Sequence, residues 1–178
     1  PIVHYNQLMP QAKNIVVSVE NILAGLVVFS IGLAKKVLLA DSLSPIASQG
    51  FDLVQNGAIG SLDAWMALFA YSFEIYFDFS GYSDMAIGLA LMFGILLPIN
   101  FNSPYKASNI IEFWRRWHIT LSTFLKEHIY IPLGGNKNGV LVQLSSLFVT
   151  MLIGGMWHGS GYTFLLWGAA HGALLALT

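Results

Sequence analysis

The segment that decides the fold is residues 140–178, which read VLVQLSSLFVTMLIGGMWHGSGYTFLLWGAAHGALLALT. These 39 residues contain no Asp, Glu, Lys or Arg. One helical crossing of a bilayer needs about 20 apolar residues, so the segment has room for two crossings. The Gly-Ser-Gly at residues 159–161 marks the expected break between them, because clustered glycines interrupt helices. The sequence therefore predicts a pair of membrane-spanning helices.

The composition of the whole chain points the same way. Of its 178 residues, 56% are hydrophobic and 10% are charged, whereas an ordinary soluble domain has about 25% charged residues. A soluble chain of this length could not bury so much apolar surface, and the same composition excludes intrinsic disorder. A net charge of −1 without a basic stripe argues against a nucleic-acid partner. Because the chain has no Cys, disulfides, thiol catalysis and Cys-based zinc sites are excluded. We expect an all-α, polytopic membrane helical bundle.

Three further apolar segments are expected to contribute to this bundle. The first lies around Ile15–Ala34 and is expected to stop at the Lys pair of residues 35–36. The second, Leu62–Phe79, is apolar apart from three acidic residues, and the third is the uncharged run Met85–Tyr105, which is expected to end at Pro98. These segments raise the number of expected spans beyond the pair described above.

The segment Ser108–Tyr130 is expected to be an interfacial helix. Asn109 followed by Glu112 resembles a helix N-cap with its reciprocal partner. One series of mainly apolar residues recurs at helical spacing, and the polar residues fall on another side of the helix. The series is Phe113, Trp117, Leu121, Phe124 and His128. This pattern is typical of a helix at the level of the membrane surface. The glycine-rich residues 134–139 after it predict a turn, and they lack the ending of a phosphate-binding loop.

Histidines in apolar surroundings are the first candidates for chemistry, because ionisable groups at bilayer depth cost about 2.5–3.5 kcal/mol and are retained mainly for function. His158 has apolar sequence on both sides, and an imidazole can remove a proton from a hydroxyl near neutral pH. The alternative is an interfacial histidine bonded to a carbonyl. Small neighbours favour a packing role for His171, while His4 and His128 are expected to be peripheral. No HExxH pattern exists and no carboxylate stands at ligand spacing from His158, so no metal site is expected.

Three acidic residues lie in or beside the apolar segments, and they allow a different function. Glu74 and Asp78 share a helix face, and Asp84 follows closely. Such acids could form the ion or proton path of a coupled transporter. The alternative, which we prefer, is that they bond to Ser, Tyr or Arg partners and hold helices together.

Several motifs follow one another in an order that resembles the membrane-bound O-acyltransferase (MBOAT) family. The motifs are YFDFSGYSDMAIG (76–88), NFNSPY (100–105), FWRRWHITLS (113–122), YIPLGGN (130–136), MWHG (156–159) and WGAAHG (167–172). The fourth motif resembles the branch that includes bacterial alginate O-acetyltransferases. Because members of the family are longer, the chain is expected to be one partial membrane domain (residues 1–178) without the early and late helices. The implied fold is a ring of tilted helices around a funnel that leads to His158.

The resemblance also implies roles for individual residues. His158 corresponds to the family's catalytic histidine, and His118 to a second histidine, although the WRRWH sequence alone suggests an interfacial anchor. Glu74 departs from the pattern, since this branch usually has Gln. The residues expected to contact substrate are Asp78, Asn102, Trp157, Arg115 and Arg116. We also expect His118, Asn102 or backbone N–H groups near Gly159 to stabilise the oxyanion.

The resemblance implies an O-acyltransferase in the bacterial cytoplasmic (inner) membrane, with several membrane passes. The donor would be an acyl thioester, either acetyl-CoA or a carrier-protein thioester, and no cofactor would be tightly bound. The acceptor would be a hydroxyl of an exported polysaccharide, or of a periplasmic or extracellular protein that relays the acyl group. The remaining alternative is the ion-coupled transporter, which would depend on Glu74, Asp78 and Asp84 instead of His158.

Overall fold

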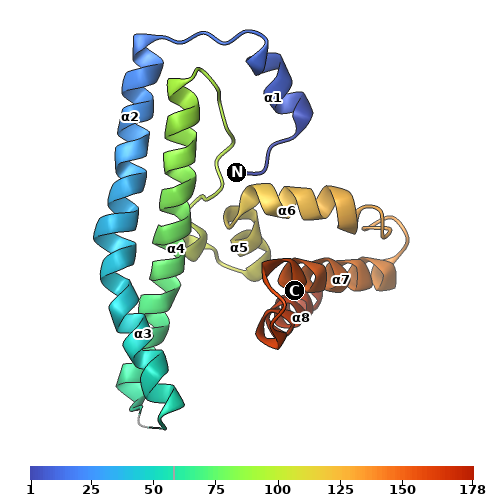
Figure 1. The fold of residues 1–178 in the computed structure, drawn as a ribbon. Helices are drawn as coiled ribbons and strands as arrows, with labels where there is room; N and C mark the ends of the chain where they lie inside the picture. Colours follow the sequence, from blue (N-terminus) through green and yellow to red (C-terminus); the bar gives the residue numbers. More distant parts are fainter. Residues whose placement is uncertain (58) are drawn as a thin grey trace. The chain divides into compact units, whose positions relative to one another are not determined.

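The computed structural model describes residues 1–57 and 59–178, and over these residues all regular structure is helical (Figure 1). The all-α prediction is therefore confirmed for the described part of the chain. Two of the helices are long and apolar enough to cross a membrane, Val19–Gln55 and Val140–His158.

The internal contacts divide the chain into two compact units, residues 3–99 with Pro1 and residues 100–178 with Ile2. The first unit contains α1 (Tyr5–Ala12), α2 (Val19–Ala34), the π-helical segment η1 (Lys35–Ala40), α3 (Asp41–Gln55) and α4 (Ser61–Met92). The second unit contains the 3-10 turn η2 (Pro104–Lys106), α5 (Ile110–Arg116), α6 (Ile119–Leu125), the π-helical segment η3 (Lys126–Tyr130), α7 (Val140–His158) and α8 (Tyr162–Leu177).

In the first unit, α2, η1 and α3 form one continuous helix of 37 residues that runs antiparallel to α4. The α-helical segment α2 ends at Ala34 as expected, but the helix continues through Lys35 and Lys36 as η1, and both cations have carboxylate partners on α4. Lys35 Nζ lies 2.5 Å from Asp84 Oδ2, and Lys36 Nζ lies 2.5 Å from Asp78 Oδ1. At about 1.5 Å per residue this helix is roughly 55 Å long, so it extends beyond a hydrocarbon core of about 30 Å.

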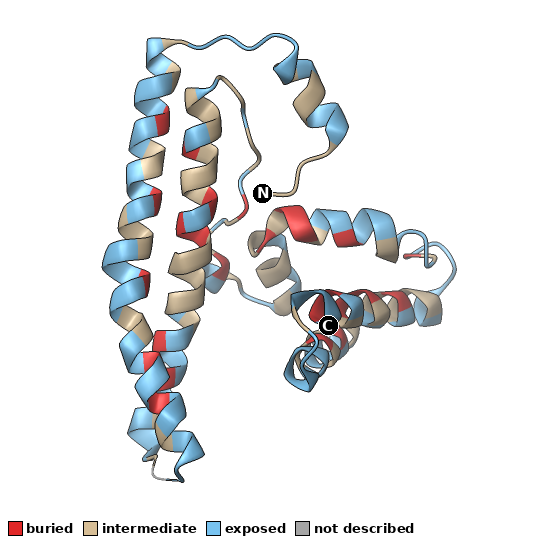
Figure 2. Cartoon of the chain, in the orientation of Figure 1, coloured by how far each residue is buried: buried red, intermediate tan, exposed pale blue. Residues whose placement is uncertain are grey.

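Small side chains line the contact between α2 and α4. The buried residues of α2 are Gly25 and Gly32, and those of α4 include Gly81 and Gly88 (Figure 2). Because glycine has no side chain, the two backbones approach closely along this line.

Helix α4 also differs from its prediction. The two expected apolar segments, 62–79 and 85–105, are joined in one helix of 32 residues that ends at Met92 and does not reach Pro98. The helix ends there because Gly94 adopts a left-handed conformation (φ 74°) and donates its N–H to the carbonyl of Leu91 at 2.8 Å.

In the second unit, the expected helix Ser108–Tyr130 is divided into α5, α6 and η3. The break falls at His118, whose backbone is left-handed (φ 42°). The predicted N-cap is confirmed, because Asn109 Oδ1 accepts a hydrogen bond from the Glu112 N–H at 2.8 Å. The Glu112 carboxylate reaches back and accepts the N–H of Ser108 at 2.7 Å.

The predicted pair at the end of the sequence is confirmed as α7 and α8, with the break at residues 159–161. Gly155 and Gly168 are buried where these two helices touch. Large apolar side chains on the same helices remain exposed, for example Leu141 (84%) and Leu177 (86%). Such exposure is rare on soluble monomers and is expected of surfaces that meet lipid or further helices.

Candidate functional site

The break between α5 and α6 is held by hydrogen bonds from an extended segment of the same unit. Asn102 donates its N–H to the carbonyl of Arg116 at 2.9 Å, which satisfies the end of α5. Ile119, the first residue of α6, donates its N–H to the carbonyl of Asn100 at 3.0 Å. Residues 100–102 therefore fix both sides of the corner at which His118 stands.

His118 is 4% exposed, and its left-handed backbone is unfavourable for a residue with a Cβ by about 1–2 kcal/mol. Its Nδ1 lies 3.2 Å from Oδ1 of Asn100, which is itself 2% exposed. Burial lowers the pKa of His118 to about 4, and a positive charge on His158 would lower this pKa further. At neutral pH this imidazole is therefore uncharged.

An indole joins the two histidines of the predicted site. The ring centroid of His118 lies 6.4 Å from that of Trp157, which in turn lies 5.1 Å from the ring of His158. Trp157 is 61% exposed, and His158 is also exposed. The structure thus brings His118, Trp157 and His158 together within one compact unit.

His158 is the last residue of α7, and α8 supports it from the other side. The ring of Trp167 meets that of His158 edge to face, with centroids 5.2 Å apart and an interplanar angle of 89°. A Cβ on Gly155 would lie 2.4 Å from the carbonyl oxygen of Phe164, so the two helices touch one turn before His158. This close approach sets the position of Trp167 against the imidazole.

His171 extends the same cluster. Its ring lies 4.8 Å from Trp167 and 5.4 Å from Trp114, measured between centroids. The buried atoms His171 Nδ1 and Trp114 Nε1 have no hydrogen-bond partner among the described residues. The packing role expected for His171 agrees with these ring contacts, whereas the two tryptophans were not predicted as parts of the site. Across residues 1–57 and 59–178, no group of three or more His, Asp or Glu could hold a metal ion.

The polar residues predicted beside the histidines have different environments. Arg116 is engaged within α5, with Nη2 2.6 Å from Glu112 Oε1, and its Nη1 donates to the carbonyl of Asn102 at 3.3 Å. Hydrogen bonds from Ser108 and Arg116 lower the pKa of the Glu112 carboxyl to about 2. Arg115 and the side chain of Asn102 are exposed. Arg116 therefore stabilises the corner, while Arg115 and Asn102 are accessible.

The acidic candidates lie in the first unit, on α4. Asp78 is paired with Lys36 and Asp84 with Lys35, both at 2.5 Å, and Glu74 is partly buried on the same helix. Two of the three acids thus pair within the fold, although their partners are lysines and not the Ser, Tyr or Arg side chains that the sequence suggested. The proximity of Asp78 to a substrate stays a prediction.

Comparison with known proteins identifies the class of this chain. Residues 1–178 match the membrane-bound O-acyltransferase (MBOAT) family. The chain belongs to this family, and the resemblance inferred from its motifs is confirmed.

Individual relatives differ in the polymer that their names specify. The chain is 55% identical over 180 residues to a peptidoglycan O-acetyltransferase of Helicobacter pylori, covering 99% of this chain and 34% of that protein. It is 47% identical over 177 residues to the probable alginate O-acetylase AlgI of Pseudomonas aeruginosa, covering 99% and 34%. It is 30% identical over 130 residues to the teichoic acid D-alanyltransferase of Bacillus subtilis, covering 69% and 32%. The chain spans about a third of the length of these relatives.

Proposed function

We propose that this protein is an integral-membrane O-acetyltransferase that acts on a hydroxyl group of an exported polysaccharide, with His158 as the general base. The observation that supports the proposal best is the pairing of His118 and His158 around Trp157. Membership of the MBOAT family supports the reaction type, and the names of the relatives support acetyl as the transferred group.

The chemistry is a direct transfer of the acyl group from a thioester to a hydroxyl, which becomes an oxygen ester. The acceptor hydroxyl oxygen attacks the thioester carbonyl carbon while His158 takes the hydroxyl proton. As the new C–O bond forms and the C–S bond breaks, the thiolate leaves and recovers a proton from the imidazolium. General base catalysis of this kind contributes about 10²–10⁴ in rate. We expect both substrates to reach His158 at the end of α7, where its side chain is exposed.

The donor would arrive from the cytoplasm as acetyl-CoA or a carrier-protein thioester, and the acceptor would be reached from the outer side of the bacterial cytoplasmic membrane. Because a relay protein can supply the attacking hydroxyl just as well, both acceptors fit the same step. The accessible residues Arg115, Asn102 and Trp157 surround the histidines in sequence and are our candidates for substrate contact. The relative with the higher identity makes peptidoglycan the first polymer to examine.

We do not propose the ion-coupled transporter, because two of its three acids are neutralised by lysines on the neighbouring helix. Ion pairs of this kind hold helices together and leave no unpaired carboxylate at Asp78 or Asp84 for a migrating ion.

The test measures transfer of labelled acetyl groups in membranes that carry the whole protein. His158→Gln should lower the rate by at least about 10² without lowering the amount of protein. The matched control is His128→Gln, since His128 is an exposed histidine on η3 whose Nδ1 lies 3.0 Å from the carbonyl of Phe124. Equal rates for wild type and His158→Gln would overturn the catalytic assignment. A separate measurement tests the acceptor: acetyl groups on muropeptides isolated after the reaction would identify peptidoglycan as the acceptor, and their absence would exclude it.

A further inference from the structure

A buried amide beside His118 determines which of its two nitrogens carries the proton. The side-chain oxygen of Asn100 lies 3.2 Å from the backbone nitrogen of Thr120. A backbone N–H can only donate, so the atom of Asn100 that faces it must be the amide oxygen and not the amide nitrogen. The orientation of this amide is therefore set by the backbone of α6.

The same oxygen faces the imidazole. His118 Nδ1 lies 3.2 Å from Asn100 Oδ1, and an amide oxygen can only accept, so Nδ1 must carry a hydrogen. In a neutral imidazole with a hydrogen on Nδ1, the lone pair is on Nε2. Because burial lowers the pKa of His118 to about 4, the neutral form is the one present near pH 7.

The hydroxyl of Thr120 completes a hydrogen-bond network in which the donors point toward the Asn100 oxygen. Ile2 donates its N–H to Thr120 Oγ1 at 3.0 Å, so the proton of this hydroxyl is available to the Asn100 oxygen 2.9 Å away. Asn100 thus accepts hydrogen bonds from both neighbours, and its 2% exposure keeps water from competing.

We propose that Asn100 is a positioning residue for acyl transfer, holding His118 in the tautomer protonated on Nδ1 so that Nε2 faces the substrates as a hydrogen-bond acceptor for a donor group other than the attacking hydroxyl. This inference rests on the proposed function and gives His118 a role different from the oxyanion donor expected from sequence. An unprotonated Nε2 cannot donate to an oxyanion, but it can accept a hydrogen bond from a second hydroxyl or an N–H group of a substrate, while the proton of the attacking hydroxyl passes to His158. Asn100 was overlooked in the sequence because its side chain acts through His118, while Asn102 two residues later was chosen.

The first test is spectroscopic and needs no substrate. In the whole protein labelled with 15N-histidine, His118 should show a protonated Nδ1 and an unprotonated Nε2 at pH 7, with the signal assigned by its loss in His118→Gln. An unprotonated Nδ1 on His118 would overturn the proposal. Because this measurement does not depend on acetyl transfer, it separates a failure of the tautomer assignment from a failure of the proposed function.

The second test compares two substitutions of Asn100. Asn100→Asp keeps an acceptor oxygen for Nδ1 and should retain the Nδ1-protonated form, with activity recovering at pH values above the His118 pKa, which the new carboxylate raises. Asn100→Leu removes the acceptor and should lower kcat about 10–100-fold, the loss typical of an orienting partner, with little change in KM for the donor. Equal activity of Asn100→Leu and wild type, with both proteins folded, would contradict the positioning role.

Thr120 supplies a further comparison if Asn100→Leu fails to fold. Thr120→Ser keeps the hydroxyl that donates to Asn100 Oδ1, whereas Thr120→Val removes it and leaves the backbone N–H in place. We expect both variants to keep His118 protonated on Nδ1, because the Thr120 N–H that orients the Asn100 oxygen is unchanged, and we expect a reduced kcat only in Thr120→Val, where Asn100 loses one of its donors. An unprotonated Nδ1 on His118 in Thr120→Val would show that the backbone N–H does not orient the Asn100 amide and would contradict the proposal.

Discussion

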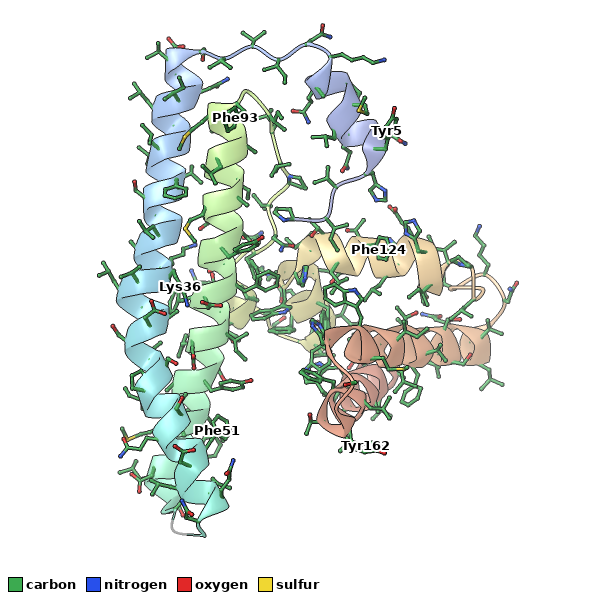
Figure 3. All side chains as sticks on the ribbon, in the orientation of Figure 1. Tyr5, Lys36, Phe51, Phe93, Phe124 and Tyr162 are labelled. Carbon is green, nitrogen blue, oxygen red and sulfur yellow. The ribbon has the colours of Figure 1, made fainter. Side chains whose placement is uncertain are left out.

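Gly32 on α2 and Gly81 on α4 lie in direct backbone contact, since a Cβ added to either would lie 2.6 Å from the carbonyl oxygen of the other. Two turns away, Gly25 and Gly88 repeat the same relationship with the same reciprocal distance of 2.6 Å. A spacing of seven residues returns to the same helix face, so these glycines form one continuous contact line. The contact fixes the register in which Lys35 and Lys36 meet their acidic partners on α4. Lys36 is labelled in Figure 3.

Gly32→Ala should destabilise this helix pair. The new methyl group would meet the Gly81 carbonyl and the Met85 nitrogen, which are backbone atoms and cannot rotate away. We expect a loss of about 1–3 kcal/mol, the usual cost of overpacking, seen as a lower melting temperature of the detergent-solubilised protein. The control is Gly60→Ala, where the nearest atom is the end of the exposed Asp63 side chain at 3.2 Å. Equal melting temperatures for Gly32→Ala and wild type would contradict the close contact.

Lys35→Met should reduce the amount of protein that inserts stably, because it leaves Asp84 as an unpaired charge near the middle of an apolar helical hairpin. A charge at bilayer depth costs about 2.5–3.5 kcal/mol, and Asp84 is paired with Lys35 at 2.5 Å in the folded protein. The double variant Lys35→Met/Asp84→Asn removes both charges and should recover most of the lost protein.

Membrane fractions of the single and double variants measure this effect directly, with Lys13→Met, an exposed lysine of the same unit, as the control. If the double variant is no better than Lys35→Met, the two side chains are not coupled. Normal acetyl transfer by the double variant would also argue against ion transport through Asp84.

Local signals in the sequence were sufficient for some elements. The Gly-Ser-Gly break between α7 and α8 and the Asn109 cap of α5 depend on residues within one or two turns, and both were predicted correctly. The continuation of the helix through Lys35 was not predicted, since its partner Asp84 is 49 positions away. The charged side chains of Lys35 and Lys36 are accommodated in the continuing helix by carboxylates on α4.

In the candidate site, too, features that depend on local sequence were predicted and features that depend on long-range contacts were not. His118 and His158 were found by type and motif, but the left-handed break at His118 was hidden within a helical spacing of aromatic residues. A positive φ at a residue other than glycine leaves no mark in the sequence, because here it is held by two long-range hydrogen bonds: the Asn100 carbonyl accepts the Ile119 N–H, and the Asn102 N–H donates to the Arg116 carbonyl. Asn100 itself could be recognised only once its side chain was seen against the imidazole.

The stability of the second unit should fall in acid through Glu112. Hydrogen bonds from Ser108 and Arg116 lower the pKa of this carboxyl from 4.5 to about 2. A carboxyl with a lowered pKa stabilises the folded state above its ordinary pKa and loses that effect as the pH falls toward 2. Glu112→Gln should therefore flatten the decline in unfolding free energy between pH 4.5 and 2. An unchanged acid slope in Glu112→Gln would contradict this assignment, and Glu127→Gln, at an exposed position on η3, serves as the comparison.

His118 should produce a second, separate dependence on pH. Its pKa is lowered by burial from 6.5 to about 4, so between these values the unfolded chain binds a proton that the folded protein does not. The unfolding free energy should consequently decrease as the pH falls from 6.5 to 4. His118→Asn should reduce this slope while keeping the backbone, because Asn tolerates the left-handed conformation. The exposed His128 provides the control, and an equal reduction in His128→Gln would show that the slope does not report His118.

Gly168→Ala should impair catalysis more than it impairs membrane insertion. A Cβ at Gly168 would lie 2.6 Å from the carbonyl oxygen of Met151, so α8 must move away from α7 and carry the adjacent Trp167 with it. Trp167 meets the His158 ring edge to face at 5.2 Å, and a displacement of about 1 Å near a reacting group can cost 10²-fold in rate. The measurement is the rate of labelled acetyl transfer, normalised to the amount of protein in the membrane. Gly161→Ala is the matched control, because its nearest neighbour would be the Thr163 hydroxyl at an ordinary 3.4 Å. Full activity of Gly168→Ala would show that the contact of α7 with α8 does not position His158.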